Sequence, residues 1–205
     1  MFQAGAVIIA AGLSSRMGEF KPMLPLGDTT VIRKIIETFQ SAGVQKIVVV
    51  TGYRASELRA HIADMGVVCV KNERYDRSQM FDSAKLGFST LQGLCKKVFF
   101  MPVDIPLFGT DTLKKLMECG SDLVCPTCQN KKGHPILIAD YLLKEIIPYR
   151  GDYGLHGAFN QCSRKMEYLP VDDWGILYDM DTQKDYTIVK TMYDELNLQK
   201  KREDC

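Results

Sequence analysis

Short apolar runs alternate with amphipathic segments along most of this chain, and that alternation is the strongest constraint on its fold. The apolar runs have the length and unbroken character of buried strands. They occupy residues 7–10, 47–50, 67–70, 98–101 and 123–125. The segments between them repeat apolar residues at helical spacing, most clearly in Val31, Ile32, Ile35, Ile36 and Phe39. This succession predicts an α/β fold with a mostly parallel sheet and helices on both of its faces.

Helix boundaries follow from the residues that flank these patterns. Asp28 or Thr29 can cap the helix that includes residues 31–39, and Gly43 ends it. Asp82 or Ser83 can cap the helix that continues past residue 88. Each of these side chains can accept a hydrogen bond from a backbone N–H in the first helical turn. The caps therefore predict where two of the covering helices begin.

The alternation loosens after about residue 126. A polar turn over 129–133 is expected to join two strands, and a late strand is expected over 166–171. A final helix should run from about 182 to 198, and residues 199–205 form a charged tail. No linker or repeat divides the chain. We therefore expect one domain over residues 1–198, with a three-layer αβα, Rossmann-like arrangement around a mixed, mostly parallel sheet.

Composition excludes several classes of function. Lys and Arg total 26 and Asp and Glu total 25, a net charge of +1, which gives no support to a nucleic-acid-binding surface. No apolar stretch is long enough to span a membrane, and residues 1–5 lack the basic region of a signal peptide. We therefore expect a cytoplasmic protein that binds neither nucleic acid nor membrane.

The cysteines do not predict a disulfide framework. Seven are scattered along 205 residues, and their number is odd. Cys125 and Cys128 have C-x-x-C spacing, but no second pair completes a zinc site, so a redox role and a purely structural role both stay open. Cys69 and Cys95 are expected to be small core residues.

The loop after the first apolar run has the character of a phosphate-binding segment. Its small side chains would let a ligand approach the main-chain N–H groups. Gly12 and Gly18 allow unusual backbone angles, and Arg16 and Lys21 add positive charge. The spacing fits neither the P-loop nor the G-x-G-x-x-G pattern, because Ser14 replaces the second glycine. A glycine-rich surface turn with incidental charges is the alternative interpretation.

Carboxylates follow two later segments. Asp104 comes directly after the apolar run 98–101, where it can hold a hard cation such as Mg²⁺ or accept local backbone hydrogen bonds. Asp179 and Asp181 would share one face if their segment were a strand. Asp181 or Thr182 could instead cap the final helix. Because carboxyl ends of parallel strands gather ligands in open α/β sheets, we expect Asp104 to lie near the glycine-rich loop.

The loop resembles the signature A-A-G-x-S-x-R-M-G-x-x-K of nucleotidyltransferases, and more narrowly of molybdenum cofactor cytidylyltransferases. The matching residues are Ala10, Ala11, Gly12, Leu13, Ser14, Ser15, Arg16 and Lys21. The resemblance implies that this loop binds a nucleoside triphosphate and that Arg16 and Lys21 contact its phosphates. Ala10-Ala11-Gly12 is similar to the cytidine-using branch, whereas guanylyl-transferring relatives tend to have L-A-G-G.

Three further segments extend the resemblance to roughly residues 6–186. The segment 72–85 carries Met80, Ser83 and Lys85 of the family pattern, with Gln79 in place of a glycine; in relatives it lies near the base and ribose, which assigns Ser83 to the nucleotide. From the residues alone, Ser83 is a helix cap and Lys85 lies on a solvated face.

The acidic segments of the family also match. Asp104 fits the pattern G-D-M-P, although Pro102 replaces its glycine. The pattern D-I-D-T-P-E-D matches at 179–185, with Gln183 in place of proline, and favours Asp181 over Asp179 as a second metal ligand. Asp104 and Asp181 are therefore the implied metal ligands.

Two motifs are typical of the molybdenum cofactor subgroup. Gly133-His134-Pro135 and Gly151-Asp152-Tyr153-Gly154 are similar to its G-H-P and G-D-x-G segments, which lie on the pterin side. The resemblance implies that His134 and Asp152 bind the acceptor. By residue type alone, His134 is more often a structural residue in a turn.

The resemblance implies an enzyme that uses Mg²⁺ to transfer CMP from CTP to molybdopterin or its metal-loaded form, with Arg16, Lys21 and Asp104 as the catalytic set. Residues 1–126 would bind the nucleotide, residues 127–198 would bind the acceptor, and a molybdenum hydroxylase could receive the product. Two alternatives stay open: transfer to another phosphorylated acceptor, such as a sugar phosphate or a phosphorylated alcohol, and a non-catalytic protein that binds nucleotide or cofactor.

Overall fold

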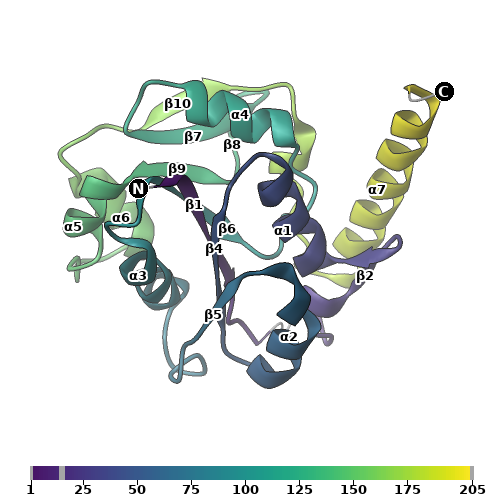
Figure 1. Cartoon of the computed structure of the whole chain (residues 1–205), viewed down its shortest axis with the longest axis horizontal. Helices are drawn as coiled ribbons and strands as arrows, with labels where there is room; N and C mark the ends of the chain where they lie inside the picture. Colours follow the sequence, from purple (N-terminus) through teal and green to yellow (C-terminus); the bar gives the residue numbers. More distant parts are fainter. Residues whose placement is uncertain (1, 14–16, 204–205) are drawn as a thin grey trace.

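A mixed eight-stranded sheet forms the middle layer of the molecule (Figure 1). The computed structural model describes residues 2–13 and 17–203. The strand order is β10-β7-β9-β6-β1-β4-β5, and β8 pairs with β7. The strands are β1 (Phe2–Ala10), β4 (Lys46–Thr51), β5 (Val68–Lys71), β6 (Cys95–Pro102), β7 (Leu123–Cys128), β8 (Lys131–Lys132), β9 (Ile136–Ala139) and β10 (Glu167–Pro170). A separate antiparallel pair consists of β2 (Pro25–Leu26) and β3 (Thr29–Thr30).

The sheet is mostly parallel, as the alternation of apolar runs and helices predicted. Strand β1 pairs in parallel with both β4 and β6, β4 pairs in parallel with β5, and β10 pairs in parallel with β7. Strand β9 runs antiparallel between β6 and β7, and β8 is antiparallel to β7. Strand β9 thus joins the first part of the chain to the second within one continuous sheet.

Helices cover both faces of the sheet (Figure 1). One face packs against α1 (Val31–Ser41), α2 (Ala55–His61), α4 (Thr110–Glu118) and α7 (Gln183–Glu203). The other face packs against α3 (Met80–Leu91), α5 (Leu143–Ile146) and α6 (Gly154–Gln161). Four 3₁₀ turns complete the elements: η1 (Lys21–Met23), η2 (Ala63–Met65), η3 (Asp140–Leu142) and η4 (Trp174–Ile176).

Strand β1 is buried on both faces because its residues alternate between the two cores. Ala6 and Ile8 pack on the α1 side, whereas Val7 and Ile9 pack on the α3 side. Helix α3 approaches this strand closely at Gly87, where an added Cβ would overlap the Val7 side chain. Glycine at this position therefore sets the distance between α3 and the strand that leads into the glycine-rich loop.

Two predicted helix caps are wrong. Helix α3 begins at Met80, and Gln79 rather than Asp82 or Ser83 is its N-cap. The Asp82 carboxylate instead accepts a hydrogen bond from the Gln79 backbone N–H at 3.0 Å and completes a capping box. Near α1, Thr29 is taken up by the short β2–β3 pair, so the N-cap position shifts to the next residue.

The final helix is longer than predicted. Helix α7 runs from Gln183 to Glu203, so its backbone continues through most of the stretch expected to be a charged tail. Lys, Arg and Glu are good helix formers, which favours this continuation. The polar turn over 129–133 is tighter than expected, because Lys131 and Lys132 already pair with β7 as β8. Both residues of the turn itself, Gln129 and Asn130, have positive φ.

Cys125 and Cys128 both lie on β7 and are buried. A separation of three residues in a strand directs their side chains to opposite faces of the sheet, which disfavours a bond between them. Burial raises the pKa of the Cys125 thiol, so it is less reactive than a free cysteine. Cys95 is fully buried, and Cys69 is partly buried.

In the part of the chain that the structure describes, no helix has the length and apolar character needed to cross a membrane.

Candidate functional site

The carboxyl ends of β1 and β6 form the floor of a cavity. Ile9 pairs with Pro102 at the last step of the parallel ladder, and Val103 N donates to Ile9 O at 3.1 Å. The chain adds β4 and β5 on one side of β1 and then returns to add β6 on the other side. This reversal is the position at which open α/β sheets bind ligands.

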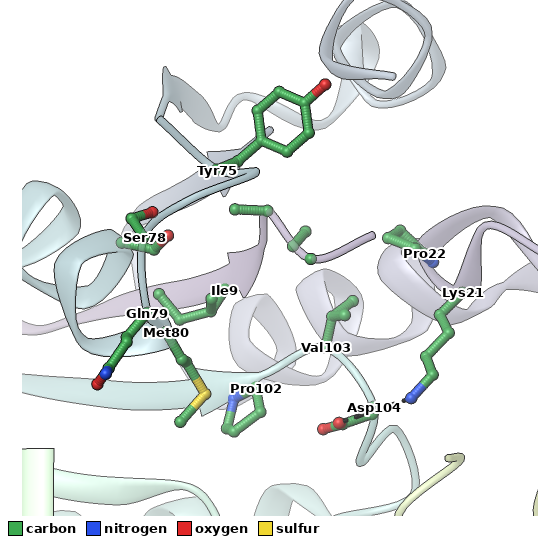
Figure 2. Close-up of a pocket in the computed structure, with 14 residues that line it drawn as sticks. Ile9, Lys21, Pro22, Tyr75, Ser78, Gln79, Met80, Pro102, Val103 and Asp104 are labelled. Atoms are coloured by element: carbon green, nitrogen blue, oxygen red, sulfur yellow. Dashed lines mark ion pairs between the residues drawn. The ribbon is translucent and has the colours of Figure 1, made fainter. Parts of the chain in front are cut away.

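Figure 2 shows the side chains that line this cavity, which has a volume of about 200 Å³. They come from the end of β1, η1, the start of α3 and the end of β6. The lining residues are Ile9, Ala10, Ala11, Gly12, Lys21, Pro22, Tyr75, Ser78, Gln79, Met80, Ser83, Pro102, Val103 and Asp104. The volume suits part of a nucleoside triphosphate, such as the base, with the remainder extending to the opening.

Six of the residues predicted to bind nucleotide therefore lie together. They are Ala10, Ala11, Gly12, Lys21, Ser83 and Asp104. Leu13 is about half exposed and lines a neighbouring cavity next to Phe20 and Tyr53. Ser14, Ser15 and Arg16 lie outside the described residues.

A charged cluster lies at one end of the cavity, where the Lys21 side chain extends toward Asp104 (Figure 2). Lys21 Nζ lies 2.8 Å from Asp181 Oδ1 and 3.9 Å from Asp104 Oδ2. The two carboxylates keep side-chain exposures of 30% and 29%, while that of Lys21 is 10%. The ammonium thus approaches two carboxylates that can still be reached from solvent.

Lys21 is more buried than the sequence predicted. A polar loop position was expected, but the residue begins the 3₁₀ turn η1 and is 8% exposed. Pro22 follows it within the turn. Burial of the stem directs the ammonium to the acidic cluster, so removal of Lys21 would affect packing as well as ligand binding.

The Asp104 carboxyl is more basic than usual. Burial raises its pKa, and the neighbouring charges of Asp181 and Asp179 raise it further, while the Lys21 ammonium acts in the opposite direction. A further cation near this group would therefore relieve unfavourable charge. Where several carboxylates meet in a partly desolvated position, a divalent cation is strongly attracted.

The segment before α7 settles which groups cap the helix. Residues 179–181 have no regular secondary structure, so the expected strand alternation of Asp179 and Asp181 is wrong. The segment follows Asp104 instead, because Met180 N donates to Asp104 O at 2.9 Å. Thr182 caps α7 in a reciprocal arrangement with Asp185, at 2.7 Å between Thr182 Oγ1 and Asp185 Oδ2. Asp181 is directed to Lys21.

The carboxylates of this cluster fit a divalent metal that is held partly by substrate and water. Within residues 2–13 and 17–203, no three His, Cys, Asp or Glu side chains gather as a ready metal centre. Mg²⁺ in phosphate-transferring enzymes is commonly held by one or two carboxylates together with substrate phosphates and water. Two partly exposed carboxylates beside a cavity that suits part of a nucleotide fit that arrangement, and Asp104 and Asp181 are such a pair.

A hydrogen-bond network supports the opposite wall of the cavity. Asn72 Nδ2 donates to Ser78 Oγ at 2.8 Å and to Ser83 Oγ at 2.9 Å. Asn72 Oδ1 accepts from Arg74 N at 3.0 Å, and its backbone N–H bonds to Thr51 O. Ser83 therefore acts within this network rather than as a helix cap. The sequence analysis placed Asn72 in a family segment but gave it no role.

Lys85 does not lie on a solvated face. Its side chain is 15% exposed, and its Nζ donates to Tyr149 O at 2.8 Å. The ammonium also lies 4.1 Å from the centre of the Phe81 ring. Burial lowers the pKa of Lys85, and the nearby Arg150 contributes in the same direction. Lys85 therefore links α3 to a segment more than 60 residues later in the chain.

His134 lies at the beginning of β9, next to the end of β6. Its ring centre is 5.9 Å from that of Phe100, and its backbone N–H donates to Ile176 O at 3.2 Å. The pairing of β9 with β6 begins at Ile136, opposite Phe100, so His134 lies two residues outside this ladder. Burial lowers the pKa of His134 to about 4, so the ring is neutral at pH 7.

Asp152 lies in an exposed loop before α6. Its backbone carbonyl, not its carboxylate, accepts a hydrogen bond from Tyr149 Oη at 2.9 Å. The loop approaches the start of α3, since a Cβ added at Gly154 would lie 3.6 Å from Phe81 Cβ and 3.8 Å from Gln79 Oε1. Neither His134 nor Asp152 is among the residues that line the cavity.

Sequence reasoning gave no role to Gln183. Its side-chain amide donates to Met17 O at 3.1 Å and to Glu19 Oε1 at 2.8 Å, and so fastens the start of α7 to the segment just after the glycine-rich loop. The partners lie more than 160 residues apart in the chain. No local pattern could have predicted the contact.

A mixed α/β sheet with a small-residue loop after β1, and an ammonium that contacts one carboxylate after β6 and another just before α7, is the arrangement expected of a nucleotidyltransferase. The chain belongs to the MobA-like NTP transferase domain family, whose model matches residues 6–166. The match includes the glycine-rich loop, the α3 segment and Asp104.

One relative in sequence is a nucleotidyltransferase by name, and two solved structures share the fold. The molybdenum cofactor cytidylyltransferase of Escherichia coli K12 is 28% identical over 192 residues, which cover 93% of this chain and 97% of that protein. The structure of Rv0371c from Mycobacterium tuberculosis H37Rv superposes with a TM-score of 0.80 at 25% identity, over 93% of this chain and 98% of that one. A manganese complex of Rv0371c has a TM-score of 0.74 at 24% identity, over 92% and 98% of the two chains.

Proposed function

We propose that this protein transfers CMP from CTP to the phosphate of molybdopterin, or of its metal-loaded form, and releases pyrophosphate. The observation that carries the proposal is the meeting of Lys21, Asp104 and Asp181 at one end of a cavity that opens beyond β1 and β6. Similarity to the Escherichia coli cytidylyltransferase extends along nearly the whole length of both proteins and supports the choice of nucleotide and acceptor.

The residues in and near the cavity have different roles in this proposal. Ala10, Ala11 and Gly12 offer a low surface and backbone groups to the nucleotide, and Ser83 contributes a hydroxyl held by Asn72. Lys21, with Arg16 from outside the described residues, would hold the β- and γ-phosphates. All residues that line the cavity lie between Ile9 and Asp104, which supports the placement of the nucleotide within residues 1–126; residues 127–198 remain the proposed acceptor half.

The reaction requires an oxygen of the acceptor phosphate to attack the α-phosphorus of CTP. A new P–O bond forms, the bond between the α-phosphorus and the bridging oxygen breaks, and negative charge collects on departing pyrophosphate. Catalysis then depends on positioning and on positive charge near the leaving group, which Lys21 and Arg16 supply. A divalent cation held by Asp104 and Asp181 would supply further charge at the transferred phosphoryl group. Mg²⁺ is the cation that we propose, and the manganese complex of Rv0371c supports a divalent ion of this size.

A substrate screen tests the proposal. Pyrophosphate release should be measured with each nucleoside triphosphate and Mg²⁺, with and without molybdopterin. We expect rapid release only when CTP and molybdopterin are both present, because water is a poor substitute for a positioned phosphate. Rapid turnover with a sugar phosphate and none with the pterin would refute the acceptor but leave the nucleotidyltransferase class intact.

Two matched pairs of variants test the site assignments. Asp104→Asn and Asp181→Asn preserve side-chain shape but remove the charge that a hard cation prefers, so both should lose metal-dependent turnover while retaining CTP binding. His134→Ala and Asp152→Ala should raise the KM for the acceptor and leave that for CTP nearly unchanged. An active Asp181→Asn enzyme would remove this residue from the metal site.

A further inference from the structure

The loop that precedes α6 holds an aromatic ring in solvent on a strained backbone. Tyr153 is 87% exposed, and its φ is +65°. A left-handed conformation is uncommon for a large side chain and persists only where the surroundings impose it. The next residue, Gly154, also has positive φ, at +53°. Two successive residues with positive φ thus turn the chain sharply at Tyr153.

Contacts on the neighbouring residues impose this conformation. Tyr149 Oη donates to Asp152 O at 2.9 Å, and Lys85 Nζ donates to Tyr149 O at 2.8 Å. The Phe81 and Tyr149 rings lie 6.2 Å apart. An added Cβ at Gly151 or Gly157 would meet Tyr149 Oη at 2.5 Å, so the Tyr149 ring is closely surrounded by glycine backbone. The loop is anchored through Tyr149 and leaves Tyr153 presented outward.

The loop that carries Tyr153 approaches the wall of the nucleotide cavity. Gly154 faces Gln79 and Phe81 at the first turn of α3, and Gln79 and Met80 line the cavity. Met80 is itself 50% exposed. The start of α6 therefore lies against the start of α3, and each carries an exposed apolar residue, Tyr153 and Met80. Neither apolar side chain is buried when this chain folds, so packing of the core does not explain its presence.

We infer that the Tyr153 ring is a platform on which a planar ring system of the acceptor stacks, next to the nucleotide cavity. The inference rests on the proposed function and makes it more specific, because it assigns a residue that selects acceptors with a flat, conjugated ring. A tyrosine ring has few rotatable bonds, so little conformational freedom is lost when it stacks. Stacking between a base and an aromatic side chain typically changes affinity about tenfold or more on alanine substitution.

Tyr153→Asn separates this role from a structural one. Asparagine tolerates positive φ better than tyrosine does, so the variant should melt at the same temperature as wild type or higher. Its KM for molybdopterin should rise about tenfold or more, while its KM for CTP stays within about twofold. Tyr153→Phe should behave as wild type, since it keeps the ring. Tyr168→Asn, on the exposed surface of β10, is the matched control and should leave both KM values unchanged.

The outcomes distinguish the platform from the proposed function. If wild type uses molybdopterin and Tyr153→Asn shows the same acceptor KM, the platform is refuted and the proposed function stands. A variant that loses thermal stability and raises both KM values equally would show a structural role and would also refute the platform. If wild type does not use a pterin acceptor, both proposals fail together.

Discussion

At the scale of single residues, Lys21 both balances the charge of two carboxylates and lines the nucleotide cavity. Its ammonium lies 2.8 Å from Asp181 and 3.9 Å from Asp104, so it balances their charge while it lies beside the nucleotide cavity. Removal of the ammonium would leave two carboxylates close together in a partly desolvated position. The same arrangement makes the carboxylates a better site for an added cation.

Lys21→Met should therefore destabilise the metal-free protein, and a divalent cation should offset the loss. Methionine fills the space of the stem but removes a positive charge next to both carboxylates, which we expect to lower the free energy of unfolding by about 1–2 kcal/mol. Thermal unfolding with and without Mn²⁺ measures the effect. Lys114→Met, which removes an exposed ammonium 3.6 Å from Asp111, is the control. Its unfolding temperature should match that of wild type and should not show the added dependence on Mn²⁺ expected of Lys21→Met. A Lys21→Met protein insensitive to the cation would argue against a metal site at Asp104 and Asp181.

His134 should make stability depend on pH. Its pKa is about 4 in the folded protein against 6.5 for an ordinary histidine, because burial disfavours the charged ring. The unfolded chain binds the proton first as pH falls, so the free energy of unfolding should fall between pH 6.5 and 4 and level off below pH 4. The histidine contribution should be on the order of 3 kcal/mol.

The comparison with His134→Asn isolates this effect, since other carboxyls titrate in both proteins. Denaturant unfolding at several pH values gives the difference in stability between wild type and variant. That difference should change through pH 6.5 to 4 and be constant above pH 7. A constant difference across the whole range would mean that the ring is solvated.

At the scale of elements, the sequence predicted those whose signal is local. The unbroken apolar run of β1 and the helical spacing of α1 both appear as expected, since burial on two faces or on one stripe leaves a direct pattern. Helix boundaries were less predictable. Gln79 caps α3 although Asp82 and Ser83 are stronger formal candidates, because side-chain caps compete with hydrogen bonds such as that between Asn72 and Ser83.

Contacts between distant elements were not predictable from local patterns. The approach of Asp181 to Lys21 bridges 160 residues, and only the resemblance to a family brought the two into one proposed site. The platform residue Tyr153 lies within the motif 151–154 that the family resemblance assigned to the pterin side, but no local pattern predicted its exposure or its positive φ. Prediction succeeded where one element determines the answer and failed where tertiary contacts between two elements do.

Gln183 provides a prediction at this scale, since it fastens α7 to the segment after the glycine-rich loop. Gln183→Leu removes the hydrogen bonds to Met17 O and Glu19 Oε1. The bonds are largely exposed, so stability should fall by less than about 1 kcal/mol. The KM for CTP should rise about three- to tenfold, because the loop loses an anchor.

Further variants separate the tether from a general effect on α7. Gln183→Glu places a second carboxylate beside Glu19 and should raise the CTP KM further. When Glu19→Gln is combined with Gln183→Glu, the double variant should recover part of the lost CTP affinity, as expected if the two side chains are in direct contact. Lys184→Leu, at the adjacent exposed position, should leave the KM unchanged. Equal effects of Gln183→Leu and Lys184→Leu would contradict a specific tether.

At the scale of the whole molecule, the antiparallel strand β9 determines how the two proposed halves behave. It pairs with β6 on one side and β7 on the other, so the sheet continues without a break from the nucleotide cavity to the later segments. Neither half has a core of its own, because the clusters on both faces contain residues from early and late elements. We therefore expect both halves to unfold together.

CTP binding should then shift one cooperative transition rather than a part of it. With Mg²⁺ and CTP at one hundred times the dissociation constant, the free energy of unfolding should rise by about 2.7 kcal/mol. For a chain of this size that corresponds to roughly 5–10 °C in melting temperature. Circular dichroism and the fluorescence of Trp174, which lies outside the proposed nucleotide-binding half, should report the same midpoint with and without CTP. GTP at equal concentration should give a smaller shift, because a pocket shaped for a pyrimidine leaves polar groups unpaired beside a purine. Two separated transitions, with only one shifted by CTP, would show that the acceptor half folds independently of the nucleotide site.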